Sequence, residues 1–229
     1  MRDFWYAFEY PTLYDKSVLE IGCGRGRRLL QAVNAGARRV VGIDPDVQAL
    51  DVARTAVGER AQLFAGVIEE FPLEQFDIII SESTLEHIVN VPQLLEECKS
   101  RLTANGRLYF VFGPLYHAPD GDHGWLRATL PGYPYIPWYW GHLLFAPIAE
   151  RRLRKSHGPQ WPYLHLNKHT VQEFTAMFQA SGLHIISYKT NIMHHSYRGR
   201  LLARLARIPL LTKYCTLNIS VVAQTEGGR

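Results

Sequence analysis

The chain has 229 residues, of which 47% are hydrophobic and 20% are charged, so we expect one compact globular domain with a sizeable core. These proportions exclude a fibrous or intrinsically disordered protein. The formal net charge of +4 is modest for an enzyme that tracks phosphates, which makes nucleic acid the less favoured partner.

The first chemically informative stretch is a buried strand, a glycine-rich turn, a helix and a second buried strand. The turn is Gly22-Cys23-Gly24-Arg25-Gly26, the helix is expected from Arg27 to Ala35, and the second strand ends at Asp44. Glycines let the chain bend sharply and bring main-chain N–H groups against a ligand. An acid at the end of the second strand of such a unit reaches ribose hydroxyls. The pattern therefore predicts a nucleotide pocket.

Strands and helices are expected to alternate through the rest of the chain. Each boundary is marked by a helix-capping residue, a glycine stop or a change to alternating hydrophobicity. The last two strands are expected to be antiparallel. The expected segments are a helix after Asp46 ending before Gly58, strands 61–65 and 76–81, a helix over 91–102 capped by Asn90, a helix from the capping box Thr170–Glu173 to Gly182, and strands 183–192 and 216–224.

Four motifs in order resemble those of the class I S-adenosylmethionine-dependent methyltransferases. They are Glu20-x-Gly22-x-Gly24-x-Gly26, the strand Phe76–Ser81, Leu85-Glu86-His87-Ile88, and Leu102–Leu108, which resembles a turn into the fifth strand. The resemblance implies an α/β, Rossmann-like fold with a seven-stranded sheet, parallel except for the last strand, and helices on both faces. It implies a single domain over 1–229, with a substrate insertion at about 114–168.

The implied cofactor is S-adenosylmethionine, with S-adenosylhomocysteine as product. Val67 stands where relatives often carry the acid that binds adenine, so either the main-chain N–H of Ile68 is expected to bind the ring or Glu69 is expected to replace the acid. The cofactor-binding residues that the resemblance implies are Glu20, Gly22, Cys23, Gly24, Gly26, Asp44, Pro45, Ile68, Glu69 and Ser81.

Residues 81–84 read Ser-Glu-Ser-Thr, which excludes the N/D-P-P-Y/F element of methyltransferases that act on base amino groups. The Pro-Cys nucleophile of cytosine C5 enzymes is also missing. The expected acceptor is therefore a hydroxyl, with a carboxyl or amine as alternatives, on a small and partly apolar molecule.

Glu86 and His87 are the first candidates for removing the acceptor proton, since a neutral histidine is a good base near neutral pH. His123, beside Asp122, is the alternative base. Ubiquinone-type O-methyltransferases carry a metal-associated E-x-x-E-H run, but Ser83 stands at the first glutamate position here. A divalent metal at Glu86 and His87 is therefore the less favoured alternative, and no metal ligand is assigned.

The insertion at 114–168 is rich in aromatic residues and prolines, and we interpret it as a lid over the acceptor. Its uncharged stretch 128–149 has the length of a membrane span, but Pro131, Pro134 and Pro137 would break the helix. Basic segments at 151–155 and 198–213 leave two alternatives open: an enzyme at a membrane interface acting on a lipid or quinone precursor, and an RNA methyltransferase.

Three cysteines cannot all pair, and the first residues do not resemble a signal peptide. The sequence therefore predicts a cytoplasmic protein, with peripheral contact to a membrane as the alternative. No pattern predicts an oligomeric state.

Overall fold

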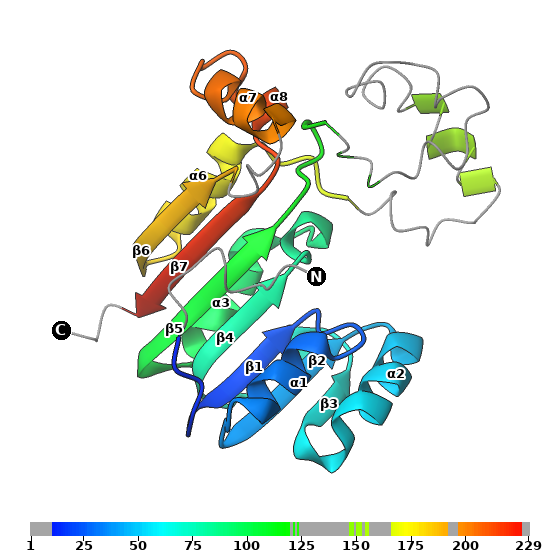
Figure 1. The fold of residues 1–229 in the computed structure, drawn as a ribbon, viewed down its shortest axis with the longest axis vertical. Helices are drawn as coiled ribbons and strands as arrows, with labels where there is room; N and C mark the ends of the chain where they lie inside the picture. The colour runs from blue at the N-terminus through cyan, green and yellow to red at the C-terminus, as the bar shows by residue number, and fades with distance from the viewer. Residues whose placement is uncertain are drawn as a thin grey trace.

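A mixed seven-stranded sheet forms the centre of the protein (Figure 1). The computed structural model describes residues 11–119, 121, 123, 147–148, 150–152, 154–155, 166–191 and 197–225. The strand order is β3-β2-β1-β4-β5-β7-β6. The strands are β1 (Ser17–Ile21), β2 (Arg39–Asp44), β3 (Gln62–Ala65), β4 (Phe76–Glu82), β5 (Leu102–Phe112), β6 (Leu183–Thr190) and β7 (Ile219–Thr225).

Only β7 runs against its neighbours among the paired strands: it is antiparallel to both β5 and β6, and the pairs from β3 to β5 are parallel. The predicted Rossmann-like sheet with a reversed last strand is thereby confirmed. The helices are α1 (Arg27–Asn34), α2 (Val47–Val57), α3 (Val91–Ser100), α6 (Val171–Ala180), α7 (Tyr197–Leu205) and α8 (Thr212–Cys215), with short 3₁₀ turns at Gly58–Arg60, Ile68–Glu70 and Leu85–His87.

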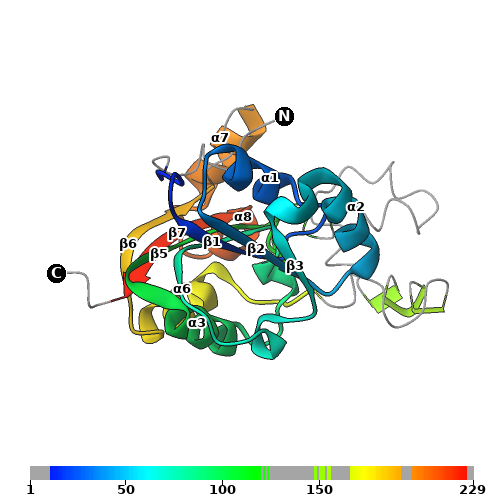
Figure 2. The same cartoon turned by 90° about the horizontal axis from the view of Figure 1, so that it is seen from below.

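Helices cover both faces of the sheet, with α1 and α2 on one side and α3 and α6 on the other (Figure 2). Each face has its own buried cluster of apolar side chains. Leu29 and Leu50 belong to the cluster under α1 and α2. Phe174 packs against Phe112 with ring centroids 4.7 Å apart on the opposite face. Both faces of the sheet are thus buried, as a parallel sheet requires.

Three predicted helix starts are confirmed by side-chain caps. Asp46 accepts hydrogen bonds from the N–H groups of Gln48 and Ala49, and Asn90 accepts one from Gln93. The capping box joins Thr170 and Glu173 in both directions. These caps satisfy N–H groups that have no partner inside the helix.

Two predicted boundaries around β5 are wrong. The helix α3 ends at Ser100, and the expected turn at 102–108 lies within β5. The β4–β5 register moves from Phe76 opposite Leu102 to Ile78 opposite Arg107, so the intervening residues of β5 bulge out of the ladder. Gly106 lies inside this irregularity, where a Cβ atom would come within 2.9 Å of the Phe76 carbonyl oxygen.

Part of the predicted insertion falls outside the described residues, including Trp125, Trp138, Trp140, Trp161, Asp120 and Asp122. Residues 151, 152, 154 and 155 of its basic segment are helical and exposed. The basic segment 198–213 falls largely on α7 and α8. No helix within the described residues is both long and apolar enough to cross a membrane.

Candidate active site

The glycine-rich loop joins β1 to α1 at the carboxyl edge of the sheet, the edge where open α/β sheets bind ligands. Gly22, Gly24 and Gly26 have φ angles of 71°, 49° and 76°, a backbone region that favours glycine. A Cβ on Gly22 would overlap the Thr84 side chain, and one on Gly26 would overlap Ala53. Gly24 differs, because no atom of the described residues lies within 4 Å of where its Cβ would be. The loop therefore offers a ligand close approach at Gly24.

Four of the five main-chain N–H groups of this loop donate to other groups of the protein. Those of Gly22 and Cys23 donate to the Ile43 carbonyl oxygen at 2.8 and 3.1 Å, and that of Gly26 donates to Cys23. The Gly24 N–H donates to Oδ2 of Asp44 at 2.7 Å. These hydrogen bonds fix the shape of the loop, whereas we expected its N–H groups to face the ligand.

Asp44, at the end of β2, connects the loop to the start of α2. Its Oδ1 accepts from the Asp46 N–H at 2.8 Å, while Oδ2 accepts from Gly24. Each carboxylate oxygen has a second lone pair, so Asp44 could also accept hydrogen bonds from a diol. The adjacent Pro45 is exposed.

Glu20 is a buried acid beneath the loop. Burial raises its pKa well above the usual value, and the nearby Arg28 only partly offsets that effect. Among the described residues, its Oε2 has no hydrogen-bond partner. Burial also raises the pKa of the Cys23 thiol, so Cys23 stays neutral and is not a nucleophile.

Of the remaining predicted cofactor residues, one is exposed and the other two form hydrogen bonds within the protein. Glu69 is exposed in the 3₁₀ turn that follows β3. The Ile68 side chain is buried, and its carbonyl oxygen accepts a hydrogen bond from Arg101. The Ser81 hydroxyl donates to the Ile21 carbonyl oxygen at 3.0 Å and so links β4 to β1.

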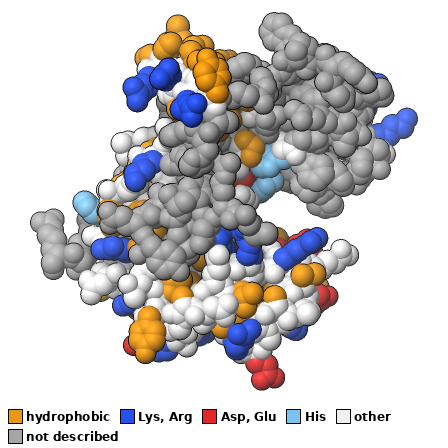
Figure 3. Space-filling view, in the orientation of Figure 1, with side chains coloured by type: hydrophobic (Ala, Val, Ile, Leu, Met, Phe, Trp, Pro, Cys, Tyr) orange, Lys and Arg blue, Asp and Glu red, His pale blue; other side chains and the backbone are white. Residues whose placement is uncertain are grey.

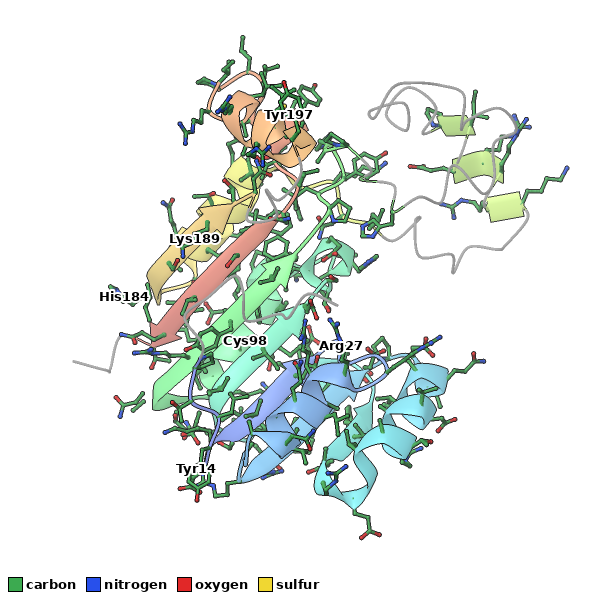
Figure 4. All side chains as sticks on the ribbon, viewed as in Figure 1. Tyr14, Arg27, Cys98, His184, Lys189 and Tyr197 are labelled. Atoms are coloured by element: carbon green, nitrogen blue, oxygen red, sulfur yellow. The ribbon has the colours of Figure 1, made fainter. Side chains whose placement is uncertain are left out.

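A partly buried ion pair beside the loop was not anticipated from the sequence. The Arg28 guanidinium, only 3% exposed, donates to both carboxylate oxygens of Glu82, through Nε and Nη2 at 2.8 Å each. Arg27 donates to the same carboxylate at 3.1 Å and lies between α1 and β4 (Figure 4). The pair fixes the start of α1 against the end of β4, which sets the position of the glycine loop.

These features fit S-adenosylmethionine, whose polar groups include an ammonium, a carboxylate and a ribose diol. The open space at Gly24 admits the ligand, Asp44 has acceptor capacity for hydroxyls, and the unpartnered oxygen of Glu20 lies beneath the loop. The ribose and methionine parts would therefore be held by Asp44 and the loop.

Glu86 lies in the 3₁₀ turn that follows β4 and is 2% exposed. Its Oε1 accepts from the Gly113 N–H at 3.3 Å, while Oε2 has no hydrogen-bond partner among the described residues. Burial raises the pKa of Glu86 to about 8. Hydrogen bonds from the main-chain N–H groups of Glu86 and Gly113 lower the pKa but do not offset the effect of burial. At neutral pH this carboxyl is therefore mostly protonated.

The two alternative bases lie side by side. The rings of His87 and His123 have centroids 5.4 Å apart, although 36 positions separate them in the sequence. One donor atom from each of Glu86, His87 and His123 lies within 4.8 Å of the other two. Both nitrogen and oxygen donors are therefore available, and the three residues could hold a divalent cation.

Asn167 holds the Glu86–His87 turn in place, and sequence reasoning missed it. Its side-chain amide donates to the carbonyl oxygens of Leu85 at 2.6 Å and Ile88 at 2.8 Å. Its main-chain N–H donates to the Glu86 carbonyl oxygen at 2.8 Å. A lone asparagine between an insertion and a helix carries no local signal of this role.

Comparisons with known proteins agree with this geometry. Residues 19–110 match the family described as "Methyltransferase domain". Those residues contain the glycine loop, Asp44 and the Glu86–His87 turn. Within this class I fold, residues 19–110 carry a methyltransferase domain. Its cofactor is S-adenosylmethionine.

Relatives of this methyltransferase domain match only part of the chain. A tRNA U34 carboxymethyltransferase of Actinobacillus pleuropneumoniae is 36% identical over 42% of this chain and 32% of its own length. A ubiquinone biosynthesis O-methyltransferase of the same species is 34% identical over 43% of this chain and 46% of its own length. The chain thus spans less than half the length of these relatives.

A solved S-adenosylmethionine-dependent methyltransferase from Listeria monocytogenes, described as putative, superimposes with a TM-score of 0.65. The superposition covers 97% of this chain and 98% of that one, at 18% identity. This likeness supports the fold of the whole chain.

Proposed function

We propose that the protein transfers the methyl group of S-adenosylmethionine to a hydroxyl oxygen of a small, partly apolar molecule. The observation that carries the proposal is the group of Glu86, His87 and His123 at the same sheet edge as the glycine loop. When bound, the cofactor supplies a methyl group on a sulfonium leaving group. The protein then has to orient the acceptor, exclude water and accept one proton.

His87 is the proposed base, because its turn is held by Asn167 and directly follows β4. In its neutral form it takes the hydroxyl proton as the new carbon–oxygen bond forms. The protonated Glu86 carboxyl can donate a hydrogen bond within the same group. His123 is the alternative base from the segment after β5.

A carboxyl or amine acceptor stays the alternative to the hydroxyl, and RNA stays the alternative to a small molecule. The names of the two relatives point to different acceptors, and the family match ends at residue 110. The segments that follow β5 are outside that match. They are where we place the acceptor site.

The test is to incubate the protein with methyl-labelled S-adenosylmethionine and a cell extract, and then to separate organic-soluble, aqueous and RNA fractions. The proposal expects label in a small organic-soluble product that survives mild alkali, because methyl ethers resist conditions that hydrolyse methyl esters. Alkali-released label would indicate a carboxyl acceptor. Label in RNA would replace the proposal with the RNA alternative.

A further inference from the structure

The helix α7 and the segment that joins it to α8 form a surface that combines exposed apolar side chains with positive charge. Leu210 is 84% exposed and Tyr197 is 75% exposed, and both lie in or next to these helices. Apolar and basic side chains gather on this end of the molecule (Figure 3), and Figure 4 places Tyr197 there. We call the following residues the α7–α8 surface: Tyr197, Arg200, Leu201, Arg204, Arg207, Ile208 and Leu210.

The charge of this surface is of one sign. Residues 197–213 include five basic residues and no acid. Arg200, Arg204 and Arg207 are exposed, and no described carboxylate lies within ion-pair distance of them. Exposed guanidinium groups with no acidic partner among the described residues favour an anionic partner outside the chain.

A hollow of about 270 Å³ lies within this surface, lined by Tyr197, Arg200, Leu201 and Arg204. The two arginines are one helical turn apart, so their guanidinium groups project on the same side of α7. Such a pair matches the bidentate geometry of a phosphate group. The apolar wall of the hollow is supplied by Tyr197 and Leu201.

The surface is linked to the segment that follows β5 and carries His123. Tyr214 of α8 contacts His117 edge to face, with ring centroids 6.5 Å apart. The Leu115 N–H donates to the carbonyl oxygen of Leu217, just after α8, at 2.9 Å. A partner bound at α7 and α8 would therefore lie at the active-site end of the sheet.

We propose that the α7–α8 surface docks on an anionic lipid membrane, with a lipid phosphate between Arg200 and Arg204. Exposed leucine and isoleucine favour a membrane over RNA, because aliphatic side chains gain little from a nucleic acid but insert into the headgroup region. A second copy of the chain is disfavoured, because two such surfaces would bring arginines against arginines. Docking does not depend on the methyl-transfer reaction.

The experiment is co-sedimentation of the full chain with vesicles of phosphatidylcholine that either contain or lack phosphatidylglycerol. We expect binding only to the anionic vesicles and release as the salt concentration rises, because exposed charges are screened over about 8 Å at physiological ionic strength. Each basic side chain near an anionic surface strengthens binding roughly fivefold. Arg200→Glu with Arg204→Glu should therefore weaken binding about 25-fold or more.

Leu210→Asp tests the apolar part and should weaken binding at least about tenfold, since a leucine no longer inserts. Two matched controls lie elsewhere: Leu73→Asp, at an exposed leucine before β4, and Arg54→Glu, at an exposed arginine of α2. Both controls should bind like the wild type. Calorimetric titration with S-adenosylhomocysteine shows whether each variant is folded.

Three results would overturn the proposal. The first is no sedimentation of the wild type with anionic vesicles, or equal sedimentation with neutral ones. The second is unchanged binding by folded surface variants, which would place docking on another part of the chain. The third is a different occupant: binding to bulk tRNA without binding to vesicles, or a dimer in analytical ultracentrifugation that Leu210→Asp dissociates.

Discussion

The main-chain N–H of Asn167 donates to the carbonyl oxygen of Glu86, and the Asn167 side chain holds both ends of the same turn. Through these three hydrogen bonds, the segment that leads into α6 fixes the turn that presents Glu86 and His87. The position of the proposed base therefore depends on a residue distant in sequence.

Asn167→Ala should lower turnover while leaving S-adenosylmethionine affinity nearly unchanged, because the cofactor loop does not touch this asparagine. The loss of two hydrogen bonds should also cost about 1–3 kcal/mol of unfolding free energy. Steady-state kinetics, calorimetry and denaturant unfolding measure the three quantities. Thr170→Ala is the control, because it removes a helix cap in the same segment, at about 1 kcal/mol, without touching the turn. An equal loss of turnover in Asn167→Ala and Thr170→Ala would mean that turnover depends only on the stability of this segment, and not on the contact of Asn167 with the turn.

Asp44→Ala should weaken cofactor binding by about 2–3 kcal/mol, since it removes a charged acceptor and releases the Gly24 N–H. Asp46→Ala is the matched control, because it removes the cap of α2 but leaves Asp44 in place. Calorimetric titration should show near wild-type affinity for the Asp46 variant. Unchanged affinity in the Asp44 variant would contradict the assigned cofactor pocket.

Glu86→Gln should change how stability depends on pH. Burial raises the pKa of Glu86 to about 8 in the folded protein, so between the unfolded-state pKa and 8 the folded state binds the extra proton. The stabilisation that Glu86 gains from binding this proton is thus fully present at acid pH and is lost as pH rises toward 8. The free energy of unfolding should fall by up to about 1.4 kcal/mol for each pH unit over this range. Chemical unfolding of both proteins with a chelator present measures the slope. A wild-type slope no steeper than that of the glutamine variant over this range would refute the buried, neutral state of Glu86.

Local patterns in the sequence were sufficient to predict most of the fold. The glycine loop, the acid at the end of β2, and the caps at Asp46, Asn90 and Thr170 depend on residues within a few positions of each other. The alternating runs near the C-terminus likewise predicted the antiparallel pair β6 and β7.

The features that sequence reasoning missed depend on contacts between distant segments. Arg28 stands in a basic run and is typical of a solvated helix start, yet its partner Glu82 lies 54 positions away. Asn167 contacts the carbonyl oxygen of Leu85 across 82 positions. The bulge in β5 depends on the register with β4. No local pattern encodes these pairings.

The most direct test of the proposed chemistry compares two matched substitutions at the paired histidines. If His87 is the base, His87→Asn should lower turnover about 10²-fold or more with nearly unchanged cofactor affinity, and His123→Asn should have a smaller effect. Asparagine suits the second site because His123 has a φ of 53°, a region that asparagine tolerates better than alanine.

Chelation separates a base from a cation site. Removing divalent ions should leave wild-type turnover unchanged if His87 acts alone. A loss of turnover with chelator, its return with magnesium or manganese, and weaker manganese binding in both variants would instead assign Glu86, His87 and His123 to a cation. If His87→Asn and His123→Asn both keep wild-type turnover when chemistry limits the rate, neither histidine takes the proton. The acceptor would then have to be acidic enough to react by proximity alone.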